Sequence, residues 1–261
     1  MLQPDTIHKI VPSIKDMFNA AFPEAKTILE NTTIEAIPIY EWYYRINELN
    51  RQYGKPKIDE DEVYSFYGES FALNGNFHIA VLASRISNKS EAHFVLWHEL
   101  AHLLTSQVEY LDFDLESILA KRQLSIDSDD ATLLMGYRLW SEFIAQAIAF
   151  DLCMKNGISL KNSAKREMMA HLVAALYLQG FEYQLGLFLG QLMMDVRAAE
   201  YRDTYIADVL NKEAVNHRIS EIVQVLFNIL EEQMECVPYW QCSVSVIREL
   251  GEFCRYFLDD L

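Results

Sequence analysis

Glu69-Ser-Phe-Ala-Leu-Asn-Gly-Asn-Phe-His-Ile-Ala-Val-Leu-Ala83 consists of two short apolar runs that meet at Asn74-Gly75. Asn-Gly between two β-prone runs is the strongest short-range signal for a hairpin, because both residues accept the positive φ angles of a tight turn. The sequence therefore predicts two antiparallel strands here, the second running from about Phe77 to Ala83.

A helix is expected directly after this hairpin. Asn88 is a suitable N-cap, and Glu91 follows three residues later, as in a capping box. The helix continues through Phe94-Val-Leu-Trp-His-Glu-Leu-Ala-His-Leu-Leu104. Its apolar residues recur at helical spacing and predict one buried stripe, formed by Phe94, Trp97, Ala101 and Leu104.

Within this helix, His98-Glu99-Leu100-Ala101-His102 has the pattern H-E-x-x-H. Side chains at positions i and i+4 lie on one helix face, so the two imidazoles can bind one metal ion. Glu99 is then next to the open coordination position and can take a proton from metal-bound water. Zinc is the expected ion because it accepts tetrahedral nitrogen and oxygen ligands and keeps one position for water.

The third ligand is expected on another element, and Glu142 is the choice. It lies in the strongly apolar run Leu139–Phe150, where a carboxylate is costly unless it is paired or binds a metal. Gln146, four residues later, is a candidate acceptor for the second ring N–H of His98 or His102, although a polar residue at the helix edge is an equally good interpretation. Rival carboxylates lie in an acidic, loop-like segment, namely Glu109, Asp112, Asp114 and Glu116.

The rest of the chain is predicted to be mostly helical. Prolines at positions 12, 23, 38 and 56 divide residues 1–57 into helical pieces. A second long helix is expected from about Thr132 to Met154, ending at Asn156-Gly157. Residues from Lys161 onward show helical periodicity only. These patterns predict an α+β core with a small antiparallel sheet, and a boundary between residues 1–157 and a helical region at 158–261.

Composition excludes some classes of function. Lys and Arg number 22 and Asp and Glu 38, so the net charge is 22 − 38 = −16. A field of this sign repels phosphate backbones, so no nucleic-acid partner is expected. The N-terminus has no basic region followed by an apolar run, and no run reads as a membrane span, so the expected location is the cytoplasm. The four cysteines are expected to be reduced and mostly buried.

The quoted helix and the surroundings of Glu142 resemble the gluzincin branch of zinc metallopeptidases, and within it the ImmA/IrrE-type family. The resemblance covers roughly residues 65–155. It implies a zincin-like core in which His98, His102 and Glu142 bind zinc and Glu99 is the general base. It also implies that the second strand is the edge on which an extended substrate lies by strand addition, through Phe77, Ile79 and Val81. The chain departs from the family pattern at Val95, Ala101 and Gln146, and after the glutamate helix at Leu152–Lys155.

The leading hypothesis is therefore a zinc-dependent metallopeptidase that acts on a specific intracellular protein or peptide. An alternative from another class is a zinc-containing, non-catalytic binding or regulatory protein that works through its helical C-terminal region. A zinc hydrolase of non-peptide amides is a third hypothesis. The sequence does not select the group that stabilises the oxyanion, nor the oligomeric state. The candidates for that group are Tyr64, Tyr67, Tyr137, His171 and His217, whereas His78 is interpreted as structural.

Overall fold

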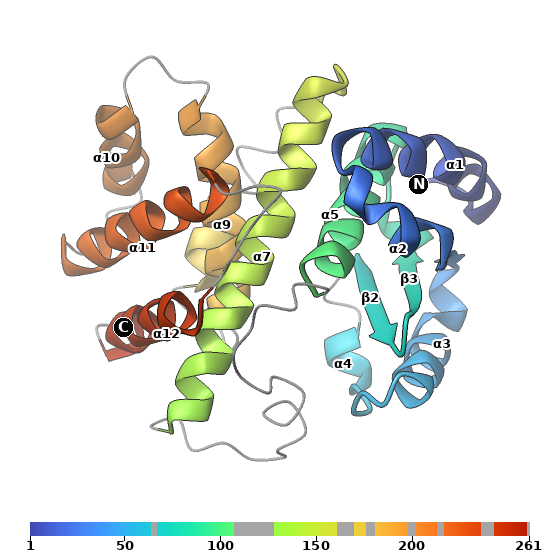
Figure 1. The fold of residues 1–261 in the computed structure, drawn as a ribbon, viewed down its shortest axis with the longest axis horizontal. Helices are drawn as coiled ribbons and strands as arrows, with labels where there is room; N and C mark the ends of the chain where they lie inside the picture. The colour runs from blue at the N-terminus through green and yellow to red at the C-terminus, as the bar shows by residue number, and fades with distance from the viewer. Residues whose placement is uncertain are drawn as a thin grey trace. The chain divides into compact units, whose positions relative to one another are not determined.

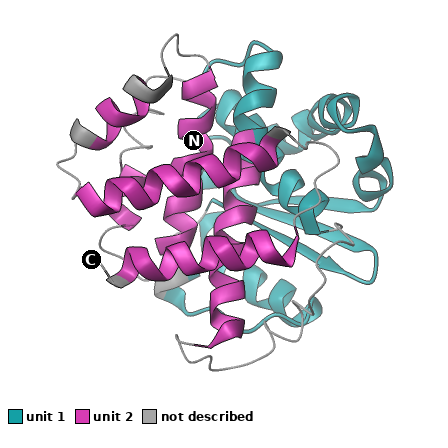
Figure 2. Cartoon of the chain, turned by 60° about the vertical axis from the view of Figure 1, so that its left-hand side comes forward, with its two compact units in different colours: residues 1–107, 148–161 teal, residues 108–147, 162–261 magenta. Residues whose placement is uncertain are grey.

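The computed structural model describes residues 1–63, 67–106, 128–160, 170–175, 181–197, 202–212, 217–235 and 243–259. The chain divides into two compact units, shown in separate colours in Figure 2. Unit 1 contains residues 1–107 and 148–161, and unit 2 contains residues 108–147 and 162–261. Helix α7 (Asp129–Lys155) contributes to both units. The domain boundary placed at residue 157 from the sequence stays a prediction.

Unit 1 contains a three-stranded sheet with helices around it (Figure 1). The strands are β1 (Thr32–Ile37), β2 (Gly68–Leu73) and β3 (Asn76–Leu82). The helices before β3 are α1 (Pro4–Ala21), α2 (Lys26–Glu30), α3 (Ile39–Gln52) and α4 (Glu60–Val63), and α5 (Lys89–Ser106) follows it. Short 3₁₀ turns lie at Pro23–Ala25 and Ala83–Arg85.

The predicted hairpin is confirmed. Strands β2 and β3 pair antiparallel with Gly68 opposite Val81 and Leu73 opposite Asn76. Asn74 and Gly75 form the turn with φ angles of 50° and 75°, the left-handed values that this dipeptide accepts most readily. The Asn-Gly signal was therefore sufficient to predict both strands.

The predicted small antiparallel sheet is corrected to a mixed sheet in the order β1-β3-β2. Strand β1 lies in the region expected to be helical, and it pairs parallel with β3, Thr32 opposite Phe77 and Ile37 opposite Leu82. Strand β3 is therefore the central strand, and β1 and β2 form the two edges. The prediction that β3 provides the substrate edge is wrong, because both of its sides are already paired.

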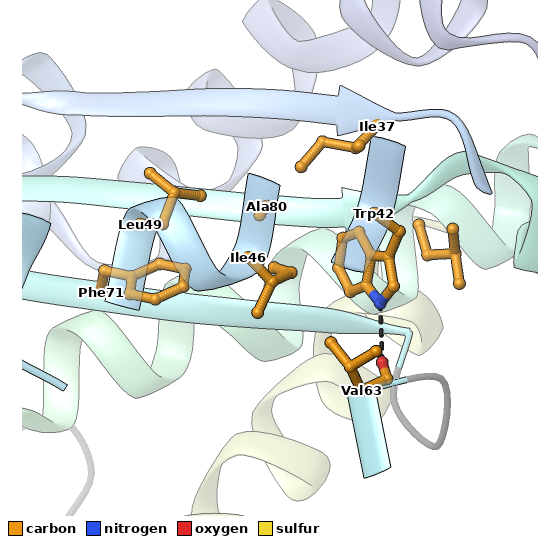
Figure 3. Packing of buried hydrophobic residues seen from close by; sticks show 8 residues of the cluster. Ile37, Trp42, Ile46, Leu49, Val63, Phe71 and Ala80 are labelled. Atoms are coloured by element: carbon orange, nitrogen blue, oxygen red, sulfur yellow. Dashed lines mark hydrogen bonds between the residues drawn. The ribbon is translucent and has the colours of Figure 1, made fainter. Parts of the chain in front are cut away.

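The sheet has one face toward α3 and the other toward α5. Side chains of Ile37, Phe71, Ala80 and Leu82 pack with α3 in a buried cluster (Figure 3). In the same cluster, the indole N–H of Trp42 donates to the carbonyl of Val63 at 2.7 Å. Side chains alternate between the two faces of a strand. The neighbours of these residues along each strand therefore point toward α5. The residues on that face include Gly68, Phe77, Ile79 and Val81.

Helix α1 covers the outer edge of β1. The ammonium group of Lys15 donates to the carbonyl of Thr32 at 2.7 Å, and Nε2 of His8 accepts from the Ala36 N–H at 3.2 Å. The helix continues through Pro12, where the sequence predicts a break. Its buried face is formed by Ile7, Ile14 and Phe18, so tertiary packing offsets the hydrogen bond that the proline removes.

The predicted start of α5 at Asn88 is confirmed, although the Glu91 carboxylate bonds one residue earlier than in a capping box. Asn88 accepts a hydrogen bond from the Glu91 N–H through its side chain at 3.1 Å, and the Glu91 carboxylate accepts from the Ser87 N–H at 2.6 Å. Every residue from Val95 to Ala101 is buried, so the helix is covered around its whole circumference there rather than along a single stripe. The H-E-x-x-H pattern therefore lies in a packed element.

Unit 2 is helical in every part that the structure describes. Helix α7 ends as predicted, with Gly157 at a φ of 64° and the Ile158 N–H donating to the carbonyl of Cys153 at 2.8 Å. It packs closely on α9, because a Cβ at Gly186 or Gly190 would lie 2.7 Å from the Cβ of Glu142 or Gln146. Residues 170–175 are also helical, and the later helices are α9 (Phe181–Arg197), α10 (Arg202–Lys212), α11 (His217–Glu235) and α12 (Val244–Asp259).

Two further predictions concern the cysteines and the membrane. Cys153 and Cys254 are buried free thiols, as predicted, and burial raises the pKa of Cys153 to about 12. Cys236 and Cys242 lie outside the described residues. In the described part of the chain, no helix combines the length and the apolar character needed to cross a membrane.

Candidate metal centre

His98 and His102 form the first half of the site. They lie four residues apart on α5, and their Nε2 atoms are 3.0 Å from each other. His98 is buried, and its ring is 4.7 Å from that of His102, centroid to centroid, in an edge-on arrangement. The helical spacing of the two histidines therefore brings their ring nitrogens to one point.

Glu142 completes the group. One ligand atom from each of His98, His102 and Glu142 lies within 4.8 Å of the other two, so these three side chains can hold a metal ion. They are the one such group among the residues that the structure describes. Glu142 lies about two turns before Phe150 on α7. The ring of Phe150 contacts that of Phe94 on α5, with 4.7 Å between centroids.

The spacing of the two histidine nitrogens is close to that around a small divalent ion. Two nitrogen ligands at 2.0–2.1 Å from zinc, separated by a tetrahedral angle, are about 3.3 Å apart. The observed 3.0 Å between the two Nε2 atoms needs only a slight opening to reach that value. Two imidazoles and one carboxylate are also a donor set that leaves a fourth position for water or substrate in catalytic zinc sites.

Glu99 lies on the sheet side of α5. It is buried, with 6% of its surface exposed. A Cβ atom placed on Gly68, the first residue of β2, would be 2.8 Å from its Oε1, 3.0 Å from its Cγ and 3.1 Å from its Cδ. The side chain of Glu99 therefore rests on the bare backbone of Gly68, a contact that sequence reasoning missed.

Gln146 follows Glu142 by one turn on α7. It is buried, with 4% of its surface exposed, and its Cβ and Cγ would be 2.7 and 3.1 Å from a Cβ at Gly190. Its suggested role as acceptor for a histidine ring N–H stays a prediction. The contact with α9 shows that Gln146 is an interior residue, not one on a solvated helix edge.

The residues predicted to contact a substrate through β3 do not form an exposed edge. Phe77 is 5% exposed, and Ile79 and Val81 are fully buried beneath α5. The family resemblance implied that they lie at an edge, and the pairing of β3 with β1 excludes this. They belong to the core that supports the site.

Four of the residues suggested for stabilising the oxyanion are described, and that role stays a prediction for each: Tyr67, Tyr137, His171 and His217. His171 contacts the side-chain oxygen of Gln184 at 2.7 Å through Nδ1, and His217 is strongly exposed. Tyr67 is 39% exposed at the start of β2. Tyr64 and the rival carboxylates Glu109, Asp112, Asp114 and Glu116 lie outside the described residues.

The prediction that His78 is structural agrees with its surroundings. Its side chain is buried, and its Nε2 is 3.2 Å from Oε2 of Glu35 on β1. Arg45 on α3 binds the same carboxylate through Nε at 3.0 Å and Nη2 at 2.8 Å. This cluster joins three elements on the α3 face of the sheet, away from the metal-holding group.

Comparisons with family models, with curated proteins and with solved structures give no match for this chain. The assignment of the site therefore depends on its own residues and their geometry.

Proposed function

We propose that this chain is a zinc-dependent hydrolase of peptide bonds, with zinc bound by His98, His102 and Glu142. The observation that carries the proposal is the convergence of these three side chains within 4.8 Å, from positions 40 residues apart in the sequence (142 − 102 = 40). A zinc ion held there would polarise the scissile carbonyl and lower the pKa of a bound water.

Glu99 has the role of general base in this proposal. It follows the first histidine directly and lies on a buried, packed helix, which holds its carboxylate in one place. A positioned carboxylate of this kind accepts the proton of the attacking water and passes it to the leaving amine. A purely structural metal site has no need of such a group, so Glu99 favours catalysis over a binding module.

Strand β2 is the proposed docking edge for an extended substrate. The outer edge of β1 is covered by Lys15 and His8 of α1, whereas β2 begins at the residue on which Glu99 rests. A peptide that pairs with β2 would gain main-chain hydrogen bonds beside the general base. The negative net charge disfavours nucleic-acid substrates.

The first test is zinc content, measured by elemental analysis after identical purification and reconstitution. We expect about one zinc per chain in the wild type and in Asp151→Ala, a control that removes a carboxylate from the same helix. Glu142→Ala should bind zinc at least about tenfold more weakly, because only two ligands remain. If none of the three proteins binds zinc, the metal centre and the enzyme function are both rejected.

The second test separates an enzyme from a binding protein. Glu99→Gln should keep its zinc and lose about 10²–10⁴-fold in turnover of a mixture of dye-quenched peptides, because the base is neutralised without a change of shape. A wild type that binds zinc but cleaves neither these peptides nor labelled casein would favour the non-catalytic binding protein instead.

A further inference from the structure

Gly68 lies where the proposed base meets the proposed docking edge. It is the first residue of β2, it is buried, and its missing side chain leaves room for the carboxylate of Glu99. The three atoms nearest to an added Cβ all belong to the Glu99 side chain, at 2.8, 3.0 and 3.1 Å. Real Cβ atoms essentially never approach another heavy atom within 3.0 Å.

The far end of a flexible side chain moves more easily than a strand or a helix. An alanine at position 68 would therefore be accommodated by displacement of the Glu99 carboxylate, while both backbones stay in place. No φ in the left-handed range occurs at Gly68, so the backbone itself accepts alanine. The steric conflict thus concerns one side chain, the one to which the proposed function assigns proton transfer.

The backbone of Gly68 also has a defined direction. The Leu82 N–H donates to the carbonyl of Tyr67 at 2.8 Å, so Tyr67 and Leu82 form a hydrogen-bonded pair. Pairs alternate along an antiparallel ladder, so Gly68, opposite Val81, directs its N–H and C=O away from β3. The residue that accommodates Glu99 therefore also directs its main-chain groups toward the outer edge of β2.

We propose that Gly68 is a positioning residue that holds the Glu99 carboxylate in its working place at the end of the docking edge. The proposal rests on the hydrolase function proposed above, because it assumes that Glu99 acts on a substrate. Glycine is required at this position for the space it leaves, and not for a special backbone conformation.

The first test needs no substrate and uses melting temperatures of four full-length proteins: wild type, Gly68→Ala, Glu99→Ala and the double variant. In the Glu99→Ala background the conflict is absent. There Gly68→Ala should raise the melting temperature by about 2 °C, because alanine restricts the unfolded chain. In the wild-type background the same change should lower it or leave it unchanged.

Gly190→Ala is the matched control for this cycle. An added Cβ there would approach Gln146 and the carbonyl of Phe143, and not Glu99. It should lower the melting temperature by the same amount in both backgrounds, because sites without shared contacts add. If Gly68→Ala changes the melting temperature equally in both backgrounds, Gly68 does not hold the Glu99 side chain in place.

The second test measures turnover of the dye-quenched peptide mixture. Gly68→Ala should keep one zinc per chain and lose about 100-fold in kcat with KM within about twofold, the cost of moving a reacting group by about 1 Å. Wild-type turnover in Gly68→Ala would overturn the positioning role. A wild type without zinc or turnover would reject the proposed function, and with it this role, while the melting cycle still reports on the contact alone.

Discussion

Glu35, Arg45 and His78 show how this chain keeps charged groups beneath its surface. Burial opposes ionisation of Glu35, but the hydrogen bonds and charge of Arg45 outweigh it and lower the pKa of that carboxyl. Burial lowers the pKa of His78 below its ordinary 6.5, an effect that Glu35 opposes and Arg45 reinforces. At neutral pH the cluster therefore consists of an ion pair between Glu35 and Arg45 beside a neutral imidazole.

This arrangement predicts how folding stability depends on pH. Because His78 has a lower pKa in the folded chain, the unfolded chain binds more protons below pH 6.5, and acidification destabilises the fold. Its contribution is complete above about pH 6.5 and falls as pH drops toward the lowered pKa. The Glu35 contribution is lost in a separate window, below that group's ordinary value of 4.5.

Urea unfolding of the metal-free protein at about pH 7.5 and about pH 5.5 tests this. Chelation removes any contribution of metal binding. The wild type should lose stability between the two values, and His78→Gln, which cannot be protonated, should lose less. The neighbours of His78 are Glu35, Arg45 and the rings of Tyr53 and Phe71, so the variant leaves the rest of the cluster in place. An unchanged loss in the variant would mean that His78 does not set this dependence.

Single residues were predictable from sequence where chemistry and spacing are local. His98, Glu99 and His102 form a five-residue pattern, and Glu142 was conspicuous as a carboxylate in an apolar helix. Gly68 gave no such signal, because its importance depends on which residue of α5 lies above it. Only the three-dimensional register of strand and helix defines that contact.

At the level of elements, short-range signals predicted the hairpin, the start of α5 and the end of α7. Strand β1 was missed because its partner, β3, lies about 45 residues along the chain and pairs in parallel, which no local turn specifies. The error had a direct consequence for function. With β1 unrecognised, nothing in the sequence contradicted the edge position that the family resemblance implied for β3.

The contact between α7 and α9 gives a prediction at this scale. Gly186 lies against Glu142, while Gly190 lies against Gln146. Alanine at either position meets backbone carbonyls as well, Leu139 at 2.8 Å and Phe143 at 2.7 Å, so we expect each change to cost about 1–3 kcal/mol of stability. Only Gly186→Ala also displaces the Cβ of the proposed ligand.

The pair of variants therefore separates packing from metal binding. Denaturant unfolding should show similar losses for both. Competition with a chromophoric chelator should show zinc binding weakened by about tenfold or more in Gly186→Ala, which displaces a proposed ligand, and by less in Gly190→Ala, which displaces only Gln146, the suggested acceptor for a histidine ring N–H. Equal zinc affinities in the two variants would mean that α9 supports α7 without fixing Glu142.

At the scale of the whole molecule, a net charge of −16 opposes the close approach of two copies of the chain. Strand edges work against this, because unpaired main-chain groups attract any other extended chain. The ammonium group of Lys55 donates to two residues of β2, to the carbonyl of Ser70 at 2.9 Å and to the carboxylate of Glu69 at 2.6 Å. A flexible lysine thus lies over one of the outward-facing carbonyls of the proposed docking edge.

Removal of this group should promote association. Lys55→Ala is expected to shift sedimentation-velocity profiles toward dimers and larger species as concentration rises, because the edge loses its charged cover. Lys57→Ala is the matched control, since Lys57 lies over the ring of Tyr43 instead. Identical profiles for the two variants would count against a protective role for Lys55.

Lys55 also bears on how the proposed docking edge could bind a substrate peptide without promoting self-association of the chain. A peptide that pairs with β2 would have to displace only the ammonium group of one Lys55. That group can turn toward solvent or toward an acidic residue of the peptide. Two copies that met edge to edge would have to displace two such groups at once, each of them from its bonds to Glu69 and the Ser70 carbonyl. The same lysine would thus permit binding of a substrate peptide and discourage polymerisation of the chain. This matters most when the protein concentration is high and the substrate concentration is low.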